Sequence, residues 1–563
     1  MNREPFDLLD FPLDGLRLIE ASAGTGKTFS LAGLYLRLLV EKRLDVRDIL
    51  VMTFTRAATQ ELRERIRVRL GTAALIAADP ANAVPGNKDH DIALAIIDKA
   101  ANHEPRSRIA RRLRDAAARM DDATISTIHA FAQQAAQENA FDSGLPFDRG
   151  IQVDDAGVQH EAITDYWRSQ VFGQSRAQAN AFLELWRSPE KLKKDLGPVL
   201  NKPHLEFWDP NGGQLAVLTT TARKLWSKQK QDLEILLSQA MENDALLKAE
   251  RLYKTIVAVG GVAEFLATLE AGLAGSASGY PALPAWLADL ATVEDIGKHF
   301  KKNKKSAIYK PQDPALLMAM ASLTPVARIA ATRAALTAVR SNIRARKRAA
   351  RQFSFADMIE SLHEAITDPD RGEALAAALH RNWPYALVDE FQDTDPLQYE
   401  ILRAIYRRRA SGALVMIGDP KQAIYAFRGG DVFAYLQAAH DADGCYDLDT
   451  NYRSTQGVLN GIESLFLGAT GQTQHGPFLI PQISFQPVKC GRSPGDRVLL
   501  QNGSPIPSIT TWMVEESGLT AEQGRQRLLD ATVSEICSLL EPDTGARVPV
   551  SYTHLTLPTN REV

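Results

Sequence analysis

Residues 18–36 read LIEASAGTGKTFSLAGLYL, and this stretch decides the fold. It predicts a buried strand over residues 16–20, a glycine-rich turn and a helix that begins near Lys27. Gly24 and Gly26 allow backbone N–H groups to curl around an anion, and the following helix N-terminus adds partial positive charge. We interpret the turn as a phosphate-binding loop, rather than as a chance glycine-rich turn.

The predicted loop has the residue types that a magnesium–nucleotide complex needs. Lys27 can reach the β- and γ-phosphates, and the Thr28 hydroxyl can ligate Mg²⁺. Ala21 replaces the glycine that usually opens the pattern, and alanine is small enough for the turn. The predicted cofactors are ATP and Mg²⁺, and the loop residues are Ala21, Ser22, Ala23, Gly24, Thr25, Gly26, Lys27 and Thr28.

The bulk composition is that of an ordinary globular protein. The 563 residues are 45% hydrophobic and 24% charged, so several domains are expected. With a formal net charge of −3, any DNA-binding surface must be a local patch. The three cysteines are far apart, which disfavours a disulfide framework or a zinc site. The N-terminus lacks a signal-peptide core and no run approaches the roughly 20 apolar residues of a membrane span. The sequence therefore predicts a cytoplasmic protein with no membrane partner.

Apolar runs and helical patterns alternate along the chain. Runs at residues 48–55, 123–131, 385–390, 413–419 and 445–454 predict further buried strands. Such alternation is typical of an α/β fold with a parallel sheet. Residues 150–340 instead show helical periodicity, which predicts a large helical insertion in the sheet domain. Within it, the basic run at residues 299–310 suits either DNA contact or a solvated loop.

An acid pair follows one predicted strand, in the stretch LVDEFQDTD. Asp389 suits the coordination shell of Mg²⁺, and Glu390 suits the orientation and deprotonation of an attacking water. The alternative is an ordinary charged strand end. The pairing with a phosphate loop in the same chain favours the catalytic interpretation.

Two later stretches add candidate residues around the nucleotide. In MIGDPKQAIYAFRGGD, Gln422 comes just after a predicted strand and could sense the γ-phosphate. In LDTNYRS, Arg453 could reach the γ-phosphate as an arginine finger, and Tyr452 could stack on adenine.

Aromatic and polar side chains near predicted strand ends are candidates for DNA contact. Tyr425 and Phe427 could stack on unpaired bases beside Arg428, or they could pack in the core. Phe54 is a further stacking candidate. Backbone contacts could come from Thr55, Arg56, Thr127 and His129, although a lone histidine is more often structural.

Six motifs stand in one order along the chain: ASAGTGKT, TFTRAAT, STIHAF, VDEFQDTD, GDPKQAIYAFRGGD and LDTNYRS. In this set the chain resembles the UvrD/Rep type of superfamily 1 DNA helicases, and most closely the RecB-type subunits of exodeoxyribonuclease V. The resemblance implies a 3′-to-5′ ATP-driven motor that acts on single-stranded and duplex-end DNA in double-strand-break repair, with RecC-like and RecD-like partners.

The resemblance also implies the domain organisation and the site roles. A RecA-like domain 1A would cover residues 1–149 and 341–446, a helical domain 1B residues 150–340, and an incomplete second RecA-like domain 2A residues 447–550. Lys27 and Thr28 would hold phosphate and Mg²⁺, with Asp389 and Glu390 serving metal and water. Gln422 and Arg453 would sense the γ-phosphate and Tyr452 would stack on adenine, while single-stranded DNA would contact Phe54, Tyr425 and Phe427.

The sequence departs from the family pattern in two places. No adenine-reading glutamine precedes the loop, and Asp14 lies near where one would fall. The later motor motifs and a nuclease domain are not found, and residues 551–563 (SYTHLTLPTNREV) do not continue the expected strand. The hypothesis is a truncated chain with an extraneous tail, which diverges from the native protein near Val550.

Several functions remain open on the sequence alone. The chain is either an active helicase motor or an ATP- and DNA-binding module that does not turn over. An AddA-type helicase–nuclease subunit is the nearest alternative within the family. A P-loop ATPase unrelated to DNA would hydrolyse ATP with no response to single-stranded DNA.

Overall fold

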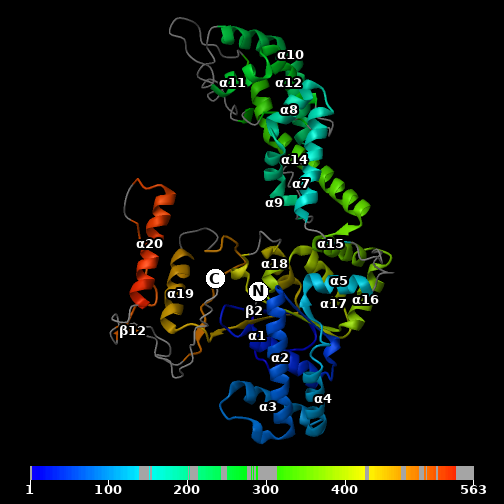
Figure 1. Cartoon of the computed structure of the whole chain (residues 1–563), viewed down its shortest axis with the longest axis vertical. Helices are drawn as coiled ribbons and strands as arrows, with labels where there is room; N and C mark the ends of the chain where they lie inside the picture. Colours follow the sequence, from blue (N-terminus) through cyan, green and yellow to red (C-terminus); the bar gives the residue numbers. More distant parts are fainter. Residues whose placement is uncertain are drawn as a thin grey trace, which may run out of the picture. The chain divides into compact units, whose positions relative to one another are not determined.

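The computed structural model describes residues 3–138, 151–152, 155–200, 202, 214–242, 250–274, 281, 283–284, 287–288, 313–424, 430–470, 477–492, 500–501, 504–514 and 518–540. Contacts divide the chain into two compact units (Figure 1). Met1–Leu145 and Ile359–Val563 form the first, called the sheet unit. Pro146–Met358 form the second, called the helical unit.

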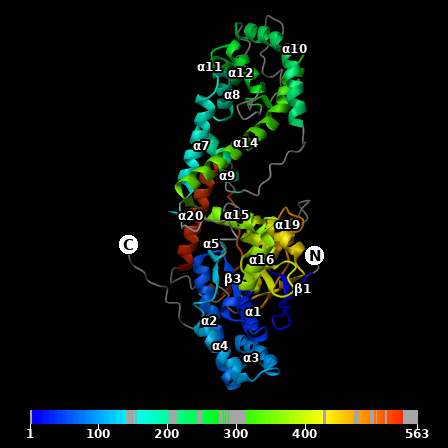
Figure 2. The same ribbon diagram turned by 90° about the vertical axis from the view of Figure 1, so that its right-hand side faces the viewer.

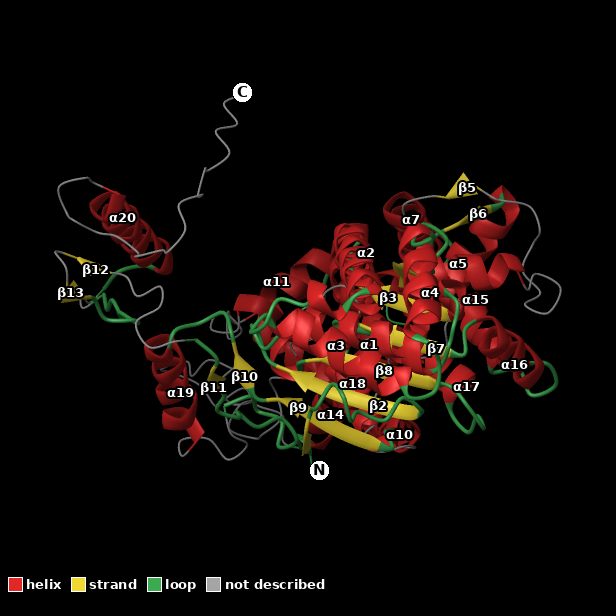
Figure 3. Ribbon diagram, turned by 90° about the horizontal axis from the view of Figure 1, so that it is seen from below, coloured by secondary structure: helices red, strands yellow, loops and turns green. Residues whose placement is uncertain are grey.

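The sheet unit is built on a seven-stranded sheet in which all neighbouring strands are parallel (Figure 3). In spatial order the strands are β1 (Glu4–Pro5), β9 (Gly444–Leu448), β2 (Gly15–Ala21), β8 (Ala413–Gly418), β7 (Tyr385–Val388), β3 (Ile49–Thr53) and β4 (Ile125–Thr127). Strands from the two ends of the chain are therefore neighbours in one sheet. The predicted α/β fold with a parallel sheet is confirmed.

Helices cover both faces of this sheet, which explains why its central strands are continuously apolar. Odd-numbered strand residues such as Ile19 and Val51 pack against α1 (Lys27–Glu41), α2 (Arg56–Ala78), α3 (Lys88–Ala101) and α4 (Arg106–Ala118). Even-numbered residues such as Leu18 and Met52 pack against α5 (Ile128–Glu138), α15 (Phe355–Ile366), α16 (Gly372–Asn382), α17 (Pro396–Tyr406) and α18 (Val432–Asp441). Because all seven strands run in the same direction, their carboxyl ends meet at one edge of the sheet.

Two of the predicted strands are wrong in their extent. The run 123–131 is a strand only to Thr127, because the Thr127 hydroxyl accepts a hydrogen bond from the Ala130 N–H and α5 begins at Ile128. The run 445–454 divides after β9. Its later part, β10 (Thr450–Asn451), leaves the large sheet and pairs in parallel with β11 (Lys489–Cys490). The other four predicted strands and the helix beginning at Lys27 are confirmed.

The other described α-helices and strands of the sheet unit lie after β10 in the chain. They are α19 (Gln456–Thr470), the antiparallel pair β12 (Leu500–Gln501) and β13 (Ser504–Pro505), and α20 (Ala521–Leu540), none of whose residues is buried. The predicted second RecA-like domain over residues 447–550 stays a prediction. The predicted extraneous tail, 551–563, lies outside the described residues.

The helical unit packs around one long helix, α14 (Ala315–Ala350). One apolar cluster joins it to α10 (Gln214–Glu242), α11 (Glu250–Val259) and α12 (Val262–Ala274). A second cluster joins it to α7 (Asp155–Phe172), α8 (Arg176–Leu185) and α9 (Pro189–Leu200). Figure 2 shows α7 and α14 side by side. The basic run 299–310 lies outside the described residues.

The structure places the end of the helical unit beyond the boundary expected at residue 340. Helix α14 runs through that position, and β6 (Gln352–Phe353) then pairs with β5 (Ile151–Gln152). The buried Lys347 ammonium contacts Asp155 at 2.5 Å and Asp357 at 2.7 Å. These contacts attach residues 341–357 to the helical unit.

Within the described residues, α14 is long and apolar enough to span a membrane by length and composition, as are α11 and α12 if taken together across their bend. The apolar window of α14 is 44% buried inside the protein and contributes to both clusters of the helical unit. A core helix passes the same composition test, so its apolarity is explained by packing.

Candidate nucleotide site and adjoining pocket

The phosphate loop lies where strand β2 ends and helix α1 begins. Gly24 and Gly26 adopt φ angles of +81° and +92°, which only glycine adopts without strain. Gly26 is the N-cap of α1, and no side chain among the described residues caps this helix end. The first-turn N–H groups of α1 are therefore open to an anion, as a phosphate site requires.

The loop lysine contacts the acid pair directly. The Lys27 ammonium donates to Glu390 Oε2 at 2.7 Å, although their residues are 363 positions apart in the chain. Glu390 itself adopts φ +50°, a left-handed conformation that is uncommon for a residue other than glycine. This backbone turns its side chain away from the line of β7 and toward the loop. Two motifs predicted separately from the sequence therefore meet in one site.

The partly buried Asp389 and the buried Asp393 lie near this ion pair. Burial, reinforced by the neighbouring Glu390 charge, raises the pKa of Asp389 to about 6, and the Lys27 charge opposes that rise. Burial and Glu390 likewise raise the pKa of Asp393 to about 6. Carboxylates held close together in this way favour a cation between them, because it would relieve both desolvation and mutual repulsion.

The segment after β8 places Gln422 on the same edge. Within η6 (Pro420–Gln422), the Gln422 amide donates to Asp419 Oδ2 at 2.7 Å. The Lys421 ammonium contacts Asp419 at 2.8 Å and also pairs with Glu20, the residue before the loop. Burial lowers the pKa of Lys421, but its two carboxylate partners outweigh that effect and raise it overall. The cluster thus holds the base of the phosphate loop against the segment that carries Gln422.

The turn after β10 docks on the outer side of the loop. The Asn451 amide donates to the Ala23 carbonyl at 2.7 Å, and the Tyr452 N–H donates to the Gly24 carbonyl at 2.8 Å. Asn451 Oδ1 also accepts from the Arg453 N–H at 2.8 Å. Arg453 is therefore anchored beside the loop, with its side chain exposed.

Tyr452 lies next to a lysine that the sequence did not indicate. Its ring is 45% exposed, and the Lys88 ammonium lies 4.5 Å from the ring centroid and 3.3 Å from the hydroxyl. The residue predicted to stack on adenine therefore has a cation over its ring.

We expect Gly24→Ala to weaken ATP binding by roughly tenfold or more, because a left-handed alanine costs about 1–2 kcal/mol. A Cβ at this position would also lie 2.6 Å from Arg453 Cβ and 3.0 Å from the Asn451 amide. The measurement is the dissociation constant of a fluorescent ATP analogue. Gly86→Ala is the matched control, since Gly86 has φ +80° and nothing within 4 Å of its added Cβ. Equal losses in both variants would contradict the close approach at Gly24.

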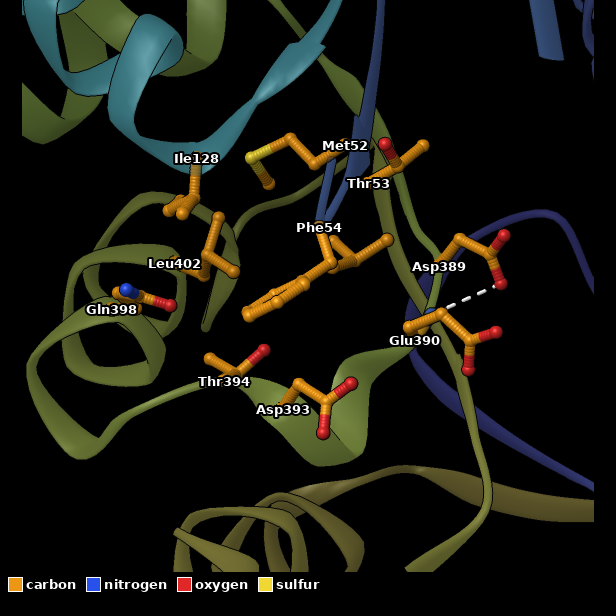
Figure 4. A pocket seen from close by; sticks show the side chains of 11 residues that line it. Met52, Thr53, Phe54, Ile128, Asp389, Glu390, Asp393, Thr394, Gln398 and Leu402 are labelled. Atoms are coloured by element: carbon orange, nitrogen blue, oxygen red, sulfur yellow. Dashed lines mark hydrogen bonds between the residues drawn. The ribbon is translucent and has the colours of Figure 1, made fainter. Parts of the chain in front are cut away.

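A pocket adjoins the acid pair on the side away from the loop (Figure 4). Its apolar wall includes Phe54, Ile128 and Leu402, and its polar wall includes Asp389 and Asp393. In Figure 4 the Phe54 ring lies between Leu402 and the acid pair, and the dashed line marks the 3.0 Å hydrogen bond from the Glu390 N–H to Asp389. An aromatic candidate for DNA contact is thus next to the candidate catalytic carboxylates.

The other candidates for DNA contact are only partly brought together. Arg56 is exposed at the start of α2, and Thr55 caps that helix by accepting from the Ala58 N–H at 3.1 Å. His129 is half-buried, and burial holds its pKa below the ordinary value. Tyr425, Phe427 and Arg428 lie outside the described residues.

Some residues of the site were not found from the sequence. Gln392, Asp419 and Asn451 stand inside the quoted motifs, but no spacing rule indicates which amide or carboxylate turns toward the loop. Asp14, considered near an adenine-reading position, lies at the amino end of β2, opposite the loop. It contacts Lys42 at 2.5 Å and accepts from the Tyr385 hydroxyl at 3.1 Å.

A phosphate loop after one strand of a parallel sheet and an acid pair after another strand define a P-loop nucleoside triphosphatase domain. The UvrD/REP helicase N-terminal domain matches residues 1–443, and the chain belongs to the UvrD/REP helicase family.

Relatives of this chain include RecB subunits of RecBCD enzymes. The subunit from Escherichia coli K12 is 32% identical over 91% of this chain and 42% of its own length. That from Haemophilus influenzae is 30% identical over 91% of this chain and 44% of its own length. The subunit from Mycolicibacterium smegmatis is 29% identical over 82% of this chain and 31% of its own length. The chain spans less than half the length of these relatives.

Proposed function

We propose that this chain is the ATP-driven motor part of a RecB-type 3′-to-5′ DNA helicase subunit that unwinds duplex DNA ends in recombinational repair. The observation that carries the proposal is the direct contact of Lys27 with Glu390, because it joins the phosphate loop and the acid pair into one hydrolytic site. The family membership and the RecB relatives support the kind of work that this site does.

The residues present fit Mg·ATP. The loop offers left-handed glycines and an uncapped helix end, and Lys27 now contacts a carboxylate oxygen where a phosphate oxygen would be its partner. Thr28 and Asp389 would hold Mg²⁺, which supplies charge neutralisation at the β- and γ-phosphates. A cation at this place would lie beside the partly buried Asp389, whose pKa is raised by burial and by the Glu390 charge.

Three side chains would share the catalytic roles in ATP hydrolysis. Glu390 orients the attacking water and accepts its proton. Gln422, held by Asp419, and Arg453, anchored by Asn451, stabilise charge on the γ-phosphate. All three side chains belong to segments joined to the phosphate loop by the contacts described above. Phosphate binding and release would therefore change the position of each segment.

Single-stranded DNA is the proposed track. Phe54 offers a stacking face in a pocket that also contains the acid pair, which places a base contact beside the hydrolytic group. Thr55, Arg56, Thr127, His129 and the segment with Tyr425, Phe427 and Arg428 are proposed as further contacts. RecC-like and RecD-like partners are proposed from the relatives, which are named as RecB subunits of RecBCD enzymes. The cytoplasmic location predicted from the sequence stays a proposal.

The deciding experiment measures ATP hydrolysis by the chain with and without single-stranded DNA. DNA-stimulated turnover supports the motor. Hydrolysis that is indifferent to DNA contradicts it and favours an unrelated P-loop ATPase. Binding of ATP and DNA without hydrolysis would identify the chain as a binding fragment of the motor.

We expect Phe54→Ala to weaken binding of single-stranded DNA by about 1–3 kcal/mol, the usual value of one base stacked on an aromatic ring. Hydrolysis without DNA should stay near the wild-type rate. Fluorescence anisotropy of a labelled oligonucleotide measures the affinity. Phe433→Ala is the control, because Phe433 is 63% exposed and lies outside the pocket. Unchanged DNA affinity in Phe54→Ala would contradict a contact between Phe54 and single-stranded DNA.

A further inference from the structure

We propose that Gln392 is a positioning residue that holds Glu390 for water activation and connects it to the segment carrying Gln422. The inference rests on the proposed function, since it concerns how the same hydrolytic site is organised. Gln392 does not touch the nucleotide in this role; it acts through its two neighbours.

Both ends of the Gln392 amide are in use. Gln392 is 3% exposed and lies in η5 (Phe391–Asp393), directly after the acid pair. Its Nε2 donates to Glu390 Oε2 at 2.8 Å, and its Oε1 accepts from the Asp419 backbone N–H at 2.9 Å. Since the amide nitrogen can only donate and the oxygen can only accept, these two contacts fix the orientation of the side chain.

The contact with Glu390 matters most once a nucleotide is bound. Lys27 and Gln392 both donate to the same oxygen, Glu390 Oε2, and among the described residues they are its two side-chain donors. When Lys27 turns to phosphate, Gln392 remains as the donor that keeps the Glu390 carboxylate in place. A fixed carboxylate is what orientation of an attacking water requires.

The contact with Asp419 connects Gln392 to Gln422, the proposed γ-phosphate sensor. The Asp419 carboxylate accepts from the Gln422 amide at 2.7 Å and from the Lys421 N–H at 3.1 Å. A displacement of Gln422 on phosphate release would therefore pass through Asp419 to Gln392 and to Glu390. These contacts lie entirely within the sheet unit, and the central one, from the Asp419 N–H to Gln392, is buried.

The end of strand β8 is shaped around this amide. A Cβ added to Gly418 would lie 2.6 Å from Gln392 Oε1 and 3.1 Å from the Gln392 backbone nitrogen. Gly418 has an ordinary φ, so its lack of a side chain is explained by the approach of Gln392 rather than by backbone strain.

Three variants test the inference: Gln392→Ala removes both contacts, Gln392→Glu keeps an acceptor for Asp419 but puts a carboxylate against Glu390, and Gly418→Ala displaces an unchanged Gln392. Gln456→Ala, which truncates an exposed amide that donates to Asn460 at 2.7 Å, is the control. Each protein is assayed for binding of Mg·ADP, for binding of Mg·ADP with aluminium fluoride as a mimic of the transferring phosphoryl group, and for kcat and KM of ATP hydrolysis.

Loss of Gln392 should affect the transition-state mimic selectively. We expect Gln392→Ala and Gln392→Glu to lower kcat and the affinity for the aluminium fluoride complex by about 10–100-fold, the usual effect of a supporting contact. Mg·ADP affinity and KM should change by no more than about twofold. Gly418→Ala should also lower kcat and the affinity for the aluminium fluoride complex. Adding Gln392→Ala to Glu390→Gln should lower kcat little further.

The outcomes separate this inference from the proposed function. Equal losses for Mg·ADP and the mimic would show a merely structural role and overturn the inference, as would wild-type behaviour in both Gln392 variants. A wild-type chain that binds Mg·ADP with no preference for the mimic also overturns it. A wild-type chain that binds no nucleotide would instead contradict the proposed function.

Discussion

Replacing Glu390 with glutamine is expected to lower ATP turnover by about 10²–10⁴-fold, the usual contribution of a general base. Glutamine has the same shape and removes only the proton-accepting charge. ATP binding should be kept or strengthened, because Lys27, now held by Glu390 at 2.7 Å, would be released for phosphate. Single-turnover hydrolysis measures the first effect and equilibrium titration with ATP measures the second.

Glu373→Gln is the control for this prediction. Glu373 is an exposed carboxylate of the same unit that pairs with Arg409 at 2.5 Å, far along the chain from the phosphate loop. It should leave hydrolysis unchanged. If Glu390→Gln retained wild-type turnover, the water-activating role would belong to another group of the buried carboxylate cluster.

Lys27→Ala is expected to lower kcat by about 10²–10³-fold and to weaken ATP binding, with and without DNA. The ammonium is the positive charge in direct contact with Glu390, and its charge opposes the rise in the pKa of Asp389. Its removal takes away a phosphate partner and leaves two neighbouring carboxylates unneutralised, which disfavours an incoming polyphosphate. Hydrolysis in the presence of single-stranded DNA and ATP titration are the measurements.

Lys42→Ala provides the matched control on the same helix. Lys42 is the C-cap of α1 and contacts Asp14 at 2.5 Å, at the opposite edge of the sheet from the loop. It should leave nucleotide binding and turnover unchanged. DNA-stimulated turnover that survived in Lys27→Ala would show that the nucleotide is held elsewhere.

The phosphate loop and the acid pair could be predicted from the sequence because their signals are local. A buried parallel strand is a continuous apolar run, and the groups that act at its carboxyl end follow it within a few residues. Lys27, Asp389 and Glu390 could therefore be predicted as site residues without coordinates, and the structure brings Lys27 and Glu390 into contact. The predicted extent of the last strand was wrong because the deciding contact is not local. Strand β10 leaves the large sheet, and the Asn451 amide donates to the Ala23 carbonyl, a contact across 428 residues.

The sequence by itself determined the parallel sheet, most of its strands and the candidate residues of the site, because apolar periodicity and motif spacing depend on neighbours in the chain. The tertiary structure alone decided which of these groups meet. Lys27 contacts Glu390, Gln392 spans Glu390 and Asp419, and the turn of Arg453 docks on the loop. Such contacts depend on strand order, since β8 lies between β2 and β7, and on backbone angles such as the left-handed turn at Glu390. Neither is encoded in the spacing of residues along the chain.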